Sequence, residues 1–272
     1  MKKPAWRPSP FILLSALVHL GALAGWLARP DAWPWALGIL LASHAGVVVA
    51  GMLPRCSLLG PNLTRLPAEA IARKEVALTI DDGPDPEVTP RVLAILASQR
   101  ACATFFCIGE RAARHPALIQ AIVAAGHRIE NHGQHHRKHA SLYGPRGWAR
   151  EVGDAQDTLA ALSGRRPQYF RALAGLRNPF LDPALQRLGL HLASWTRRGY
   201  DTRTGDADAV LARLTRGLAA GDILLLHDGH AARTPAGEPV ILAVLPRLLA
   251  ALTERQLVPA FLPDRVAERR SR

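Results

Sequence analysis

From residue 75 onward, short apolar runs alternate with longer segments whose apolar residues recur at the spacing of a helix. The seven strands that this pattern predicts cover residues 76–80, 103–108, 127–130, 168–171, 190–195, 222–227 and 257–262. Strands separated by helices form a parallel sheet that is buried under those helices. The pattern predicts either an α/β barrel or a doubly wound sheet, and by itself does not choose between them.

Polar residues gather at or just after the carboxyl ends of five predicted strands. They are Asp81 and Asp82 after the first strand, His132 and His136 after the third, Arg171 at the end of the fourth, Asp201 after the fifth, and His227 with Asp228 at the sixth. In both candidate architectures, catalytic groups lie at this edge of the sheet. An edge that combines carboxylates, imidazoles and a guanidinium favours metal-assisted hydrolysis over a purely structural role.

The segment ENHGQHHRKH, residues 130–139, holds four of the chain's eleven histidines. His132 and His136 are four residues apart, so on one helical turn both imidazoles would face the same side and could share a metal ion. A solvated polar face gives the same spacing, so the pair predicts a metal site only together with the carboxylates at the neighbouring strand end. His135 and His139 would face away from the pair and are expected in solvent.

Five short motifs resemble those of the NodB-homology polysaccharide deacetylases of carbohydrate esterase family 4. They are LTIDDGPDP (78–86), NHGQHH (131–136), FRALAG (170–175), WTRRGYDT (195–202) and LLLHD (224–228). The resemblance covers roughly residues 75 to 262. It implies a distorted (β/α)7-type barrel, and so decides between the two architectures.

The chain departs from the family pattern at several positions. Gly133 stands where the second motif usually has a serine or threonine, and the third motif lacks both of its prolines. In the fourth motif, Arg198 and Thr202 stand where an Asp and a Trp are common. Arg198 and its neighbour Arg197 fit either a solvated pair or a contact to a substrate phosphate.

The resemblance implies a divalent metal ion held by Asp82, His132 and His136. Two imidazoles make Zn²⁺ the first expectation, and a carboxylate with waters would also suit Co²⁺, Ni²⁺ or Fe²⁺.

It also implies the catalytic groups. Asp81 would be the general base, held ionised by the metal and by Arg171, and His227 the general acid, kept cationic by Asp201.

Three further residues are implied in substrate binding. The oxyanion would rest on the metal and on a backbone N–H near Ala174. Leu225 is expected to form the wall against the acetyl methyl group, and Trp195 to line the substrate pocket.

The function expected from these residues is removal of N-acetyl groups from amino sugars of an oligo- or polysaccharide. An alternative with the same chemistry is a deacetylase or deformylase of a polyprenyl-phosphate-linked sugar. A third reading, a catalytically inactive carbohydrate-binding module, is disfavoured because the expected base, ligands and acid are all present.

The N-terminal part has a different composition. Residues 11–27 and 36–53 form two apolar runs, each with its flanks about the 20 residues that cross a bilayer. We therefore expect a membrane anchor at 1–54, a linker at 55–74 and the catalytic domain at 75–272. His19 and His44, inside the runs, are expected to make polar contacts between the two helices.

Basic residues predict the orientation of this anchor. Lys2, Lys3 and Arg7 precede the first run, only Arg29 lies in the connection, and Arg55, Arg65, Arg73 and Lys74 follow the second. Positive residues favour the cytoplasmic side, so we expect an inner-membrane protein with its catalytic domain in the cytoplasm.

The formal net charge is +12, from 34 basic and 22 acidic residues. The basic residues are scattered and no nucleic-acid motif is visible, so we expect membrane headgroups or an anionic substrate and no nucleic acid. No protein partner is evident. The three cysteines, Cys56, Cys102 and Cys107, do not form a disulfide pattern and are expected to be free.

Overall fold

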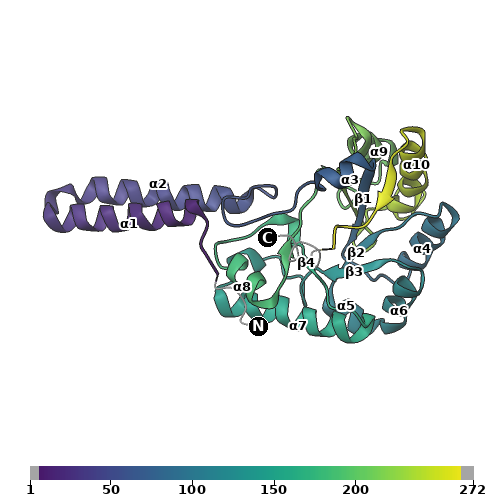
Figure 1. Cartoon of the computed structure of the whole chain (residues 1–272), viewed down its shortest axis with the longest axis horizontal. Coiled ribbons are helices and arrows are strands. Elements are labelled where there is room, and N and C mark those ends of the chain that lie inside the picture. The colour runs from purple at the N-terminus through teal and green to yellow at the C-terminus, as the bar shows by residue number, and fades with distance from the viewer. Residues whose placement is uncertain (1–5, 265–272) are drawn as a thin grey trace.

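The computed structural model describes residues 6–264. Two long helices, α1 (Pro10–Ala28) and α2 (Trp33–Met52), are joined by the 3-10 turn η1 (Pro30–Ala32) and form an antiparallel hairpin that projects from the rest of the chain (Figure 1). Each is long and apolar enough to cross a bilayer, and only 6% and 17% of the two spans are buried. Core helices of a soluble protein would be mostly buried, so this exposure argues against that alternative. A signal sequence near the N-terminus would have the same length and apolar composition.

Polar side chains join the two hairpin helices, as the sequence predicts. His19 Nε2 lies 3.2 Å from His44 Nδ1, and Ser15 Oγ lies 2.9 Å from Ser43 Oγ. The hairpin therefore pairs its few polar groups with each other and leaves apolar side chains such as Leu17 and Leu27 on its outer surface.

Eight strands form one parallel sheet. They are β1 (Glu75–Asp81), β2 (Thr104–Cys107), β3 (Arg128–Asn131), β4 (Tyr169–Phe170), β5 (His191–Leu192), β6 (Arg197–Arg198), β7 (Ile223–His227) and β8 (Val258–Ala260). The order is β5-β4-β3-β2-β1-β7-β6, and β8 pairs with the first residues of β1. The sheet is a curled, open half-barrel, which confirms the barrel-type fold over a doubly wound sheet.

The strand prediction is wrong in one respect. The expected strand 190–195 is shorter, and β6 follows it as an additional strand. Two arginines make up β6, so it carries none of the apolar signal by which the other strands were found.

Helices follow one another around the outside of the sheet (Figure 1). They are α3 (Ala68–Ala72), α4 (Thr89–Ser98), α5 (Gly109–Arg114), α6 (Pro116–Ala124), α7 (Pro145–Ser163), α8 (Leu181–Leu188), α9 (Ala207–Thr215) and α10 (Val240–Glu254), with the 3-10 turns η2 (Ala140–Leu142) and η3 (Leu173–Gly175). Pro90, Pro116 and Pro145 lie in the first turns of α4, α6 and α7, where the missing N–H costs no hydrogen bond.

Alternation along the strands separates two apolar layers. Leu78 and Ile80 of β1 belong to the large core cluster with the helices, whereas Ala77 belongs to a smaller cluster on the inner face with Trp195 and Leu225. Because neighbouring residues of a strand face opposite sides, Thr79 and Asp81 continue the inner face of β1. Polar side chains on that face therefore meet at the carboxyl edge of the half-barrel.

The hairpin joins the domain through close backbone contacts. Arg177 N donates to Gly51 O at 3.0 Å, and Ser194 Oγ donates to Pro54 O at 2.7 Å. A Cβ on Gly51 would lie 2.2 Å from Arg177 O, so only glycine permits this approach. The end of α2 thus packs directly on the loop that follows η3.

We expect Gly51→Ala to loosen this junction and to lower the free energy of unfolding by about 1–3 kcal/mol, because the added methyl group overpacks it. Gly38→Ala is the matched control, since nothing lies within 4 Å of a Cβ at Gly38 on the same helix. Thermal unfolding in detergent and protease cleavage within residues 53–66 measure the effect. Equal behaviour of the two variants would contradict the docking.

Candidate functional site

The predicted site residues converge at the carboxyl ends of β1, β3 and β7. Asp81 is the last residue of β1 and pairs in register with His227, the last residue of β7. Asp82 follows with a left-handed backbone (φ 74°), which turns its side chain from the line of the strand towards the end of β3. His132 comes directly after β3.

Asp82, His132 and His136 form a compact cluster. Asp82 Oδ1 lies 3.1 Å from His132 Nε2 and 3.0 Å from His136 Nε2, and one donor atom from each residue lies within 4.8 Å of the others. Asp82 Oδ1 and His136 Nε2 are buried and make no hydrogen bond among the described residues. Buried lone pairs without partners are costly, and a cation would satisfy them, so this donor set fits a divalent metal ion.

Hydrogen bonds orient this cluster from behind. His132 Nδ1 donates to Arg171 O at 2.8 Å, which leaves Nε2 directed at Asp82. Burial favours the neutral acid, but the close approach of the His132, His136 and His230 imidazoles outweighs it and holds the pKa of Asp82 well below its ordinary value. Burial lowers the pKa of His136, so this imidazole is neutral as a metal ligand requires.

His132 and His136 do not lie on a helical turn, so the helical geometry considered from their four-residue spacing is wrong. Residues 132–136 form a loop in which Gly133 and His136 both have positive φ, at 87° and 53°. Asn131 Oδ1 accepts from Gly133 N at 2.8 Å and begins this turn. The imidazoles converge because the loop folds back on itself.

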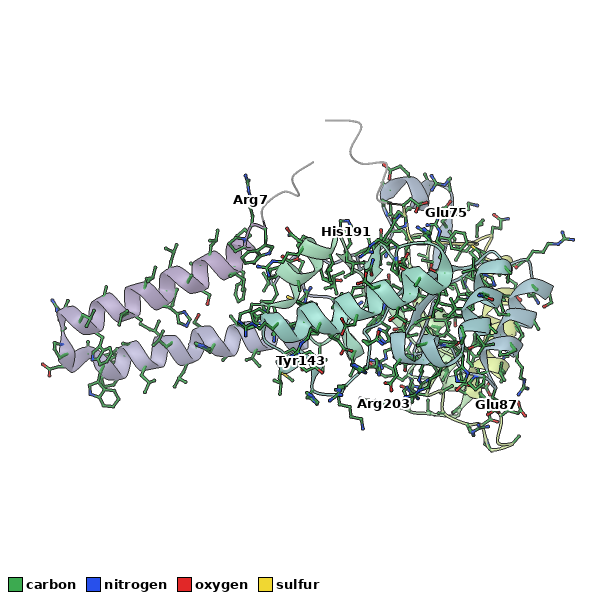
Figure 2. The ribbon with its side chains drawn as sticks, turned by 90° about the horizontal axis from the view of Figure 1, so that it is seen from below. Arg7, Glu75, Glu87, Tyr143, His191 and Arg203 are labelled. Atoms are coloured by element: carbon green, nitrogen blue, oxygen red, sulfur yellow. The ribbon has the colours of Figure 1, made fainter. Side chains whose placement is uncertain are left out.

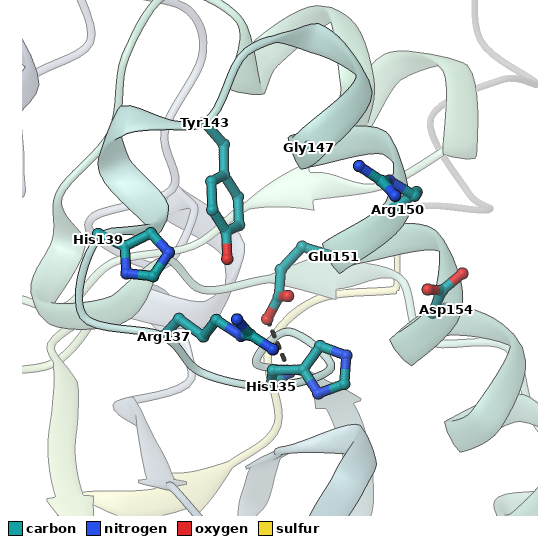
Figure 3. A pocket seen from close by; sticks show the side chains of 8 residues that line it. All are labelled: His135, Arg137, His139, Tyr143, Gly147, Arg150, Glu151 and Asp154. Atoms are coloured by element: carbon teal, nitrogen blue, oxygen red, sulfur yellow. Dashed lines mark hydrogen bonds between the residues drawn. The ribbon is translucent and has the colours of Figure 1, made fainter.

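Glu151, on α7, fixes the far end of this loop and was not predicted. Its Oε1 accepts from His135 N at 2.8 Å and from His136 N at 3.0 Å. A Cβ on Gly133 would lie 2.8 Å from the same oxygen, which explains the glycine in place of the family's hydroxyl residue. Figure 3 shows Glu151 reaching from α7 to His135 in a polar pocket beside the cluster.

Asp81 and Arg171 form a buried pair next to the cluster. Arg171 Nη1 donates to Asp81 Oδ1 at 2.7 Å, and both side chains are almost fully buried. The second oxygen, Asp81 Oδ2, lies 3.8 Å from His132 Nε2. One carboxylate oxygen is thus fixed by the guanidinium, while the other faces the metal-binding groups.

His227 and Asp201 form the second buried pair. His227 Nδ1 donates to Asp201 Oδ1 at 2.8 Å, and His227 N donates to Asp201 Oδ2 at 2.8 Å. Burial lowers the pKa of His227, but the charge and hydrogen bond of Asp201 more than offset this and raise it to about 9. The imidazole is therefore cationic at neutral pH, with Nε2 left to donate.

Asp81 and His227, one member of each buried pair, line the same cavity of about 130 Å³. Its wall includes the three residues expected to bind substrate, Ala174, Trp195 and Leu225. Ala174 has a left-handed backbone (φ 51°) within η3, so its peptide group is held in an uncommon orientation at the cavity wall.

Two further residues complete the site. His230 Nδ1 donates to Asp82 Oδ2 at 3.1 Å, and Asp228 Oδ2 accepts from Thr89 Oγ1 at 2.5 Å. Burial raises the pKa of Asp228 to about 7. A Cβ on Gly83 would meet both Asp228 oxygens at 2.5 Å, so Asp228 packs under the turn that carries Asp82.

Comparisons with known proteins agree on one family. A family model described as polysaccharide deacetylase matches residues 69–193. A chitooligosaccharide deacetylase from Sinorhizobium fredii is 33% identical over 208 residues, which are 74% of this chain and 96% of that protein. A peptidoglycan-N-acetylglucosamine deacetylase from Bacillus cereus is 33% identical over 158 residues, which are 57% and 73% of the two chains. A solved family 4 carbohydrate esterase from Streptomyces lividans, in complex with acetate, superimposes with a TM-score of 0.63 at 29% identity and covers 70% of this chain and 93% of its own.

We expect Glu151→Gln to weaken Zn²⁺ binding by about tenfold or more, because an amide accepts the two loop N–H bonds more weakly than a carboxylate. Titration with Zn²⁺ by calorimetry measures the loss. Asp154→Asn, an exposed acid one turn further along α7, is the control and should bind as the wild type does. Unchanged affinity in Glu151→Gln would show that the loop does not need this anchor.

Proposed function

Because the chain belongs to the polysaccharide deacetylase family, we propose that it is a metal-dependent hydrolase that removes N-acetyl groups from amino sugars of an oligo- or polysaccharide. Family members hydrolyse amide bonds, so the chain is a hydrolase of this class. The observation that carries the metal is the pair of buried, unpartnered atoms, Asp82 Oδ1 and His136 Nε2, beside the free oxygen of Asp81.

Asp82, His132 and His136 would hold the ion. When bound, a divalent cation lowers the pKa of coordinated water and polarises the amide carbonyl group. Zn²⁺ remains the first expectation for two imidazoles and a carboxylate, with Co²⁺, Ni²⁺ and Fe²⁺ as alternatives.

Asp81 acts as the base. Its Oδ1 is held by Arg171, so Oδ2 accepts a proton from the attacking water. The guanidinium fixes the orientation of this carboxylate through that hydrogen bond.

His227 acts as the acid on the other side of the cavity. As the water oxygen bonds to the carbonyl carbon, the C–N bond breaks and the amine nitrogen takes the proton from His227 Nε2. Asp201 holds the imidazole by Nδ1, so only Nε2 can deliver this proton. The products are acetate and a free amino sugar.

The cavity wall positions the acetamide group. The N–H of Ala174 would stabilise the developing oxyanion, and Leu225 would pack against the methyl group, with Trp195 beside the sugar. The inactive-module alternative is disfavoured because both proposed proton-transfer groups are held by buried partners.

The substrate class rests on the relatives. Those reported above are named for chitooligosaccharides and for peptidoglycan N-acetylglucosamine, so we propose a polymer of N-acetylated amino sugars. These names give no support to the lipid-linked alternative. We further propose the division into an anchor (1–54), a linker (55–74) and a catalytic domain (75–272), with the anchor in a membrane.

We expect His136→Ala to lose both Zn²⁺ and acetate release, because one of three ligands is removed. Asp81→Asn should lose at least about a hundredfold in kcat and still bind Zn²⁺, because an amide cannot take the proton and Asp81 is not a ligand. Metal analysis and acetate release from an N-acetylglucosamine oligomer measure both. Metal loss in Asp81→Asn with retention in Asp82→Asn would exchange the two roles.

The His227–Asp201 pair predicts a specific pH dependence. The pKa of His227 is raised to about 9, so its acid form, and with it activity, is lost as the pH rises through that value. Asp201→Asn removes the largest contribution that raises the pKa of His227, while burial and the smaller contributions of Asp82 and Asp81 remain. The alkaline limb of kcat/KM should therefore move down by about two pH units. Asp154→Asn is the control for loss of one acidic charge, and an unmoved limb in Asp201→Asn would contradict His227 as the acid.

Basic residues at the outer ends of the hairpin lead us to propose that the catalytic domain lies on the cytoplasmic side. Fusions after Arg272 test this: green fluorescent protein should fluoresce there, and alkaline phosphatase, which needs export, should be inactive. The reverse result would place the domain outside the membrane.

A further inference from the structure

Arg197 and Arg198 of β6 face opposite sides of the sheet and have different surroundings. Arg197 pairs with Asp222 and donates to the carbonyl groups of Arg216 and Gly217. Arg197 is therefore a structural residue that ties β6 to the loop after α9.

Arg198 faces the inner side, where the substrate cavity lies. It pairs in register with Leu225 of β7 and lines the same cavity as Asp81 and His227. Neighbouring strands are about 4.8 Å apart, so the base of the Arg198 side chain lies one strand spacing from the expected acetyl wall.

The Arg198 guanidinium is held by aromatic rings and by no carboxylate. Its central carbon lies 5.4 Å from the ring centre of Trp195 and 5.1 Å from that of Tyr200. Its Nε is buried without a hydrogen-bond partner, and no acidic side chain within residues 6–264 forms an ion pair with it. The cavity wall thus carries a positive charge with unused donors.

Two more arginines surround the same tyrosine. The guanidinium carbons of Arg203 and Arg213 each lie 6.0 Å from the Tyr200 ring centre, and neither forms a recorded ion pair with a described residue. Arg203 is exposed on the lower edge of the molecule as seen in Figure 2. Like charges gathered around one ring repel one another and attract an anion.

We propose that Arg198 binds an anionic substituent, a carboxylate or a phosphate, on the amino-sugar substrate, with Arg203 and Arg213 adding positive potential around Tyr200. The inference rests on the proposed function and specifies its substrate. The Trp195 and Tyr200 rings hold the guanidinium at the cavity wall, so its two terminal nitrogens can bind two oxygens of one oxyacid group together. Because Arg198 and Leu225 are register partners on neighbouring strands, we expect that group on the acetylated ring or on the ring bonded to it.

If Arg198 had only a structural role, its substitution would lower activity on all substrates alike. If it binds an anionic group, its substitution would lower activity on anionic substrates alone. Three substrates serve as probes: a neutral N-acetylglucosamine tetramer, a tetramer alternating N-acetylglucosamine with N-acetylmuramic acid, which carries carboxylates, and N-acetylglucosamine 1-phosphate. The full chain in detergent is compared with Arg198→Gln, Arg198→Lys and Arg146→Gln. Arg146 is an exposed arginine of α7 that does not line the cavity, so it controls for net charge.

We expect Arg198→Gln to lower kcat/KM about tenfold to a hundredfold on at least one anionic substrate, mainly through KM. Its activity on the neutral tetramer should stay within about twofold, because no charged contact is lost there. Arg198→Lys should recover part of the loss, and Arg146→Gln should behave as the wild type does. The substrate that loses activity identifies a carboxylate or a phosphate as the group bound.

An equal loss on neutral and anionic substrates, or no loss on either anionic substrate, would overturn the subsite. Acetate release from none of the three would instead contradict the proposed function. Calorimetric binding of the two anionic sugars then tests the subsite alone: weaker binding to Arg198→Gln than to Arg146→Gln supports it, and equal binding overturns it.

Discussion

The Arg171 guanidinium is the interaction on which the rest of the site depends. It is fully buried, and it donates to Thr79 and Asp81 of β1 and to the carbonyl groups of Ala193 and Ser194. A buried charge without partners would cost several kcal/mol. Here each of the three guanidinium nitrogens donates at least one hydrogen bond, and the guanidinium carbon lies 4.0 Å from the centre of the Phe106 ring. One side chain therefore ties the first strand to the segment after β5, across the inside of the curled sheet.

Arg171 also acts through its backbone, because its carbonyl oxygen accepts the Nδ1 proton of His132. The same residue thus orients a proposed base by its side chain and a proposed metal ligand by its main chain. On the opposite wall, Asp201 plays a comparable part for His227 through two hydrogen bonds, one to the ring and one to the backbone. Each proposed proton-transfer group is fixed by a buried partner that does not itself face the cavity, so the sheet sets the geometry of the site before substrate binds.

Much of this arrangement could be predicted from the sequence, because it depends on strand ends. Parallel strands bring their carboxyl ends together, so Asp81, His132 and His227 had to meet once the strands were correct. The contribution of Glu151 could not be predicted, since it comes from the middle of a helix whose acidic residues look alike in sequence. The two-residue strand β6 could not be predicted, because it consists of two arginines and has no apolar residue. Without this strand, the different surroundings of Arg197 and Arg198 could not be predicted either. Once β6 is known, alternation along the strand separates their roles.

The hairpin and the substrate cavity are connected through one short segment. Gly51, at the end of α2, packs on Arg177. Pro54 lies against Gly175, and a Cβ on Gly175 would come within 2.4 Å of the Pro54 ring. Gly175 is also the neighbour of Ala174, whose left-handed peptide forms part of the cavity wall. A change in the position of α2 would therefore reach the proposed oxyanion donor across two residue contacts. The orientation of the N-terminal helices and the shape of the cavity wall are thus fixed by the same close-packed glycines.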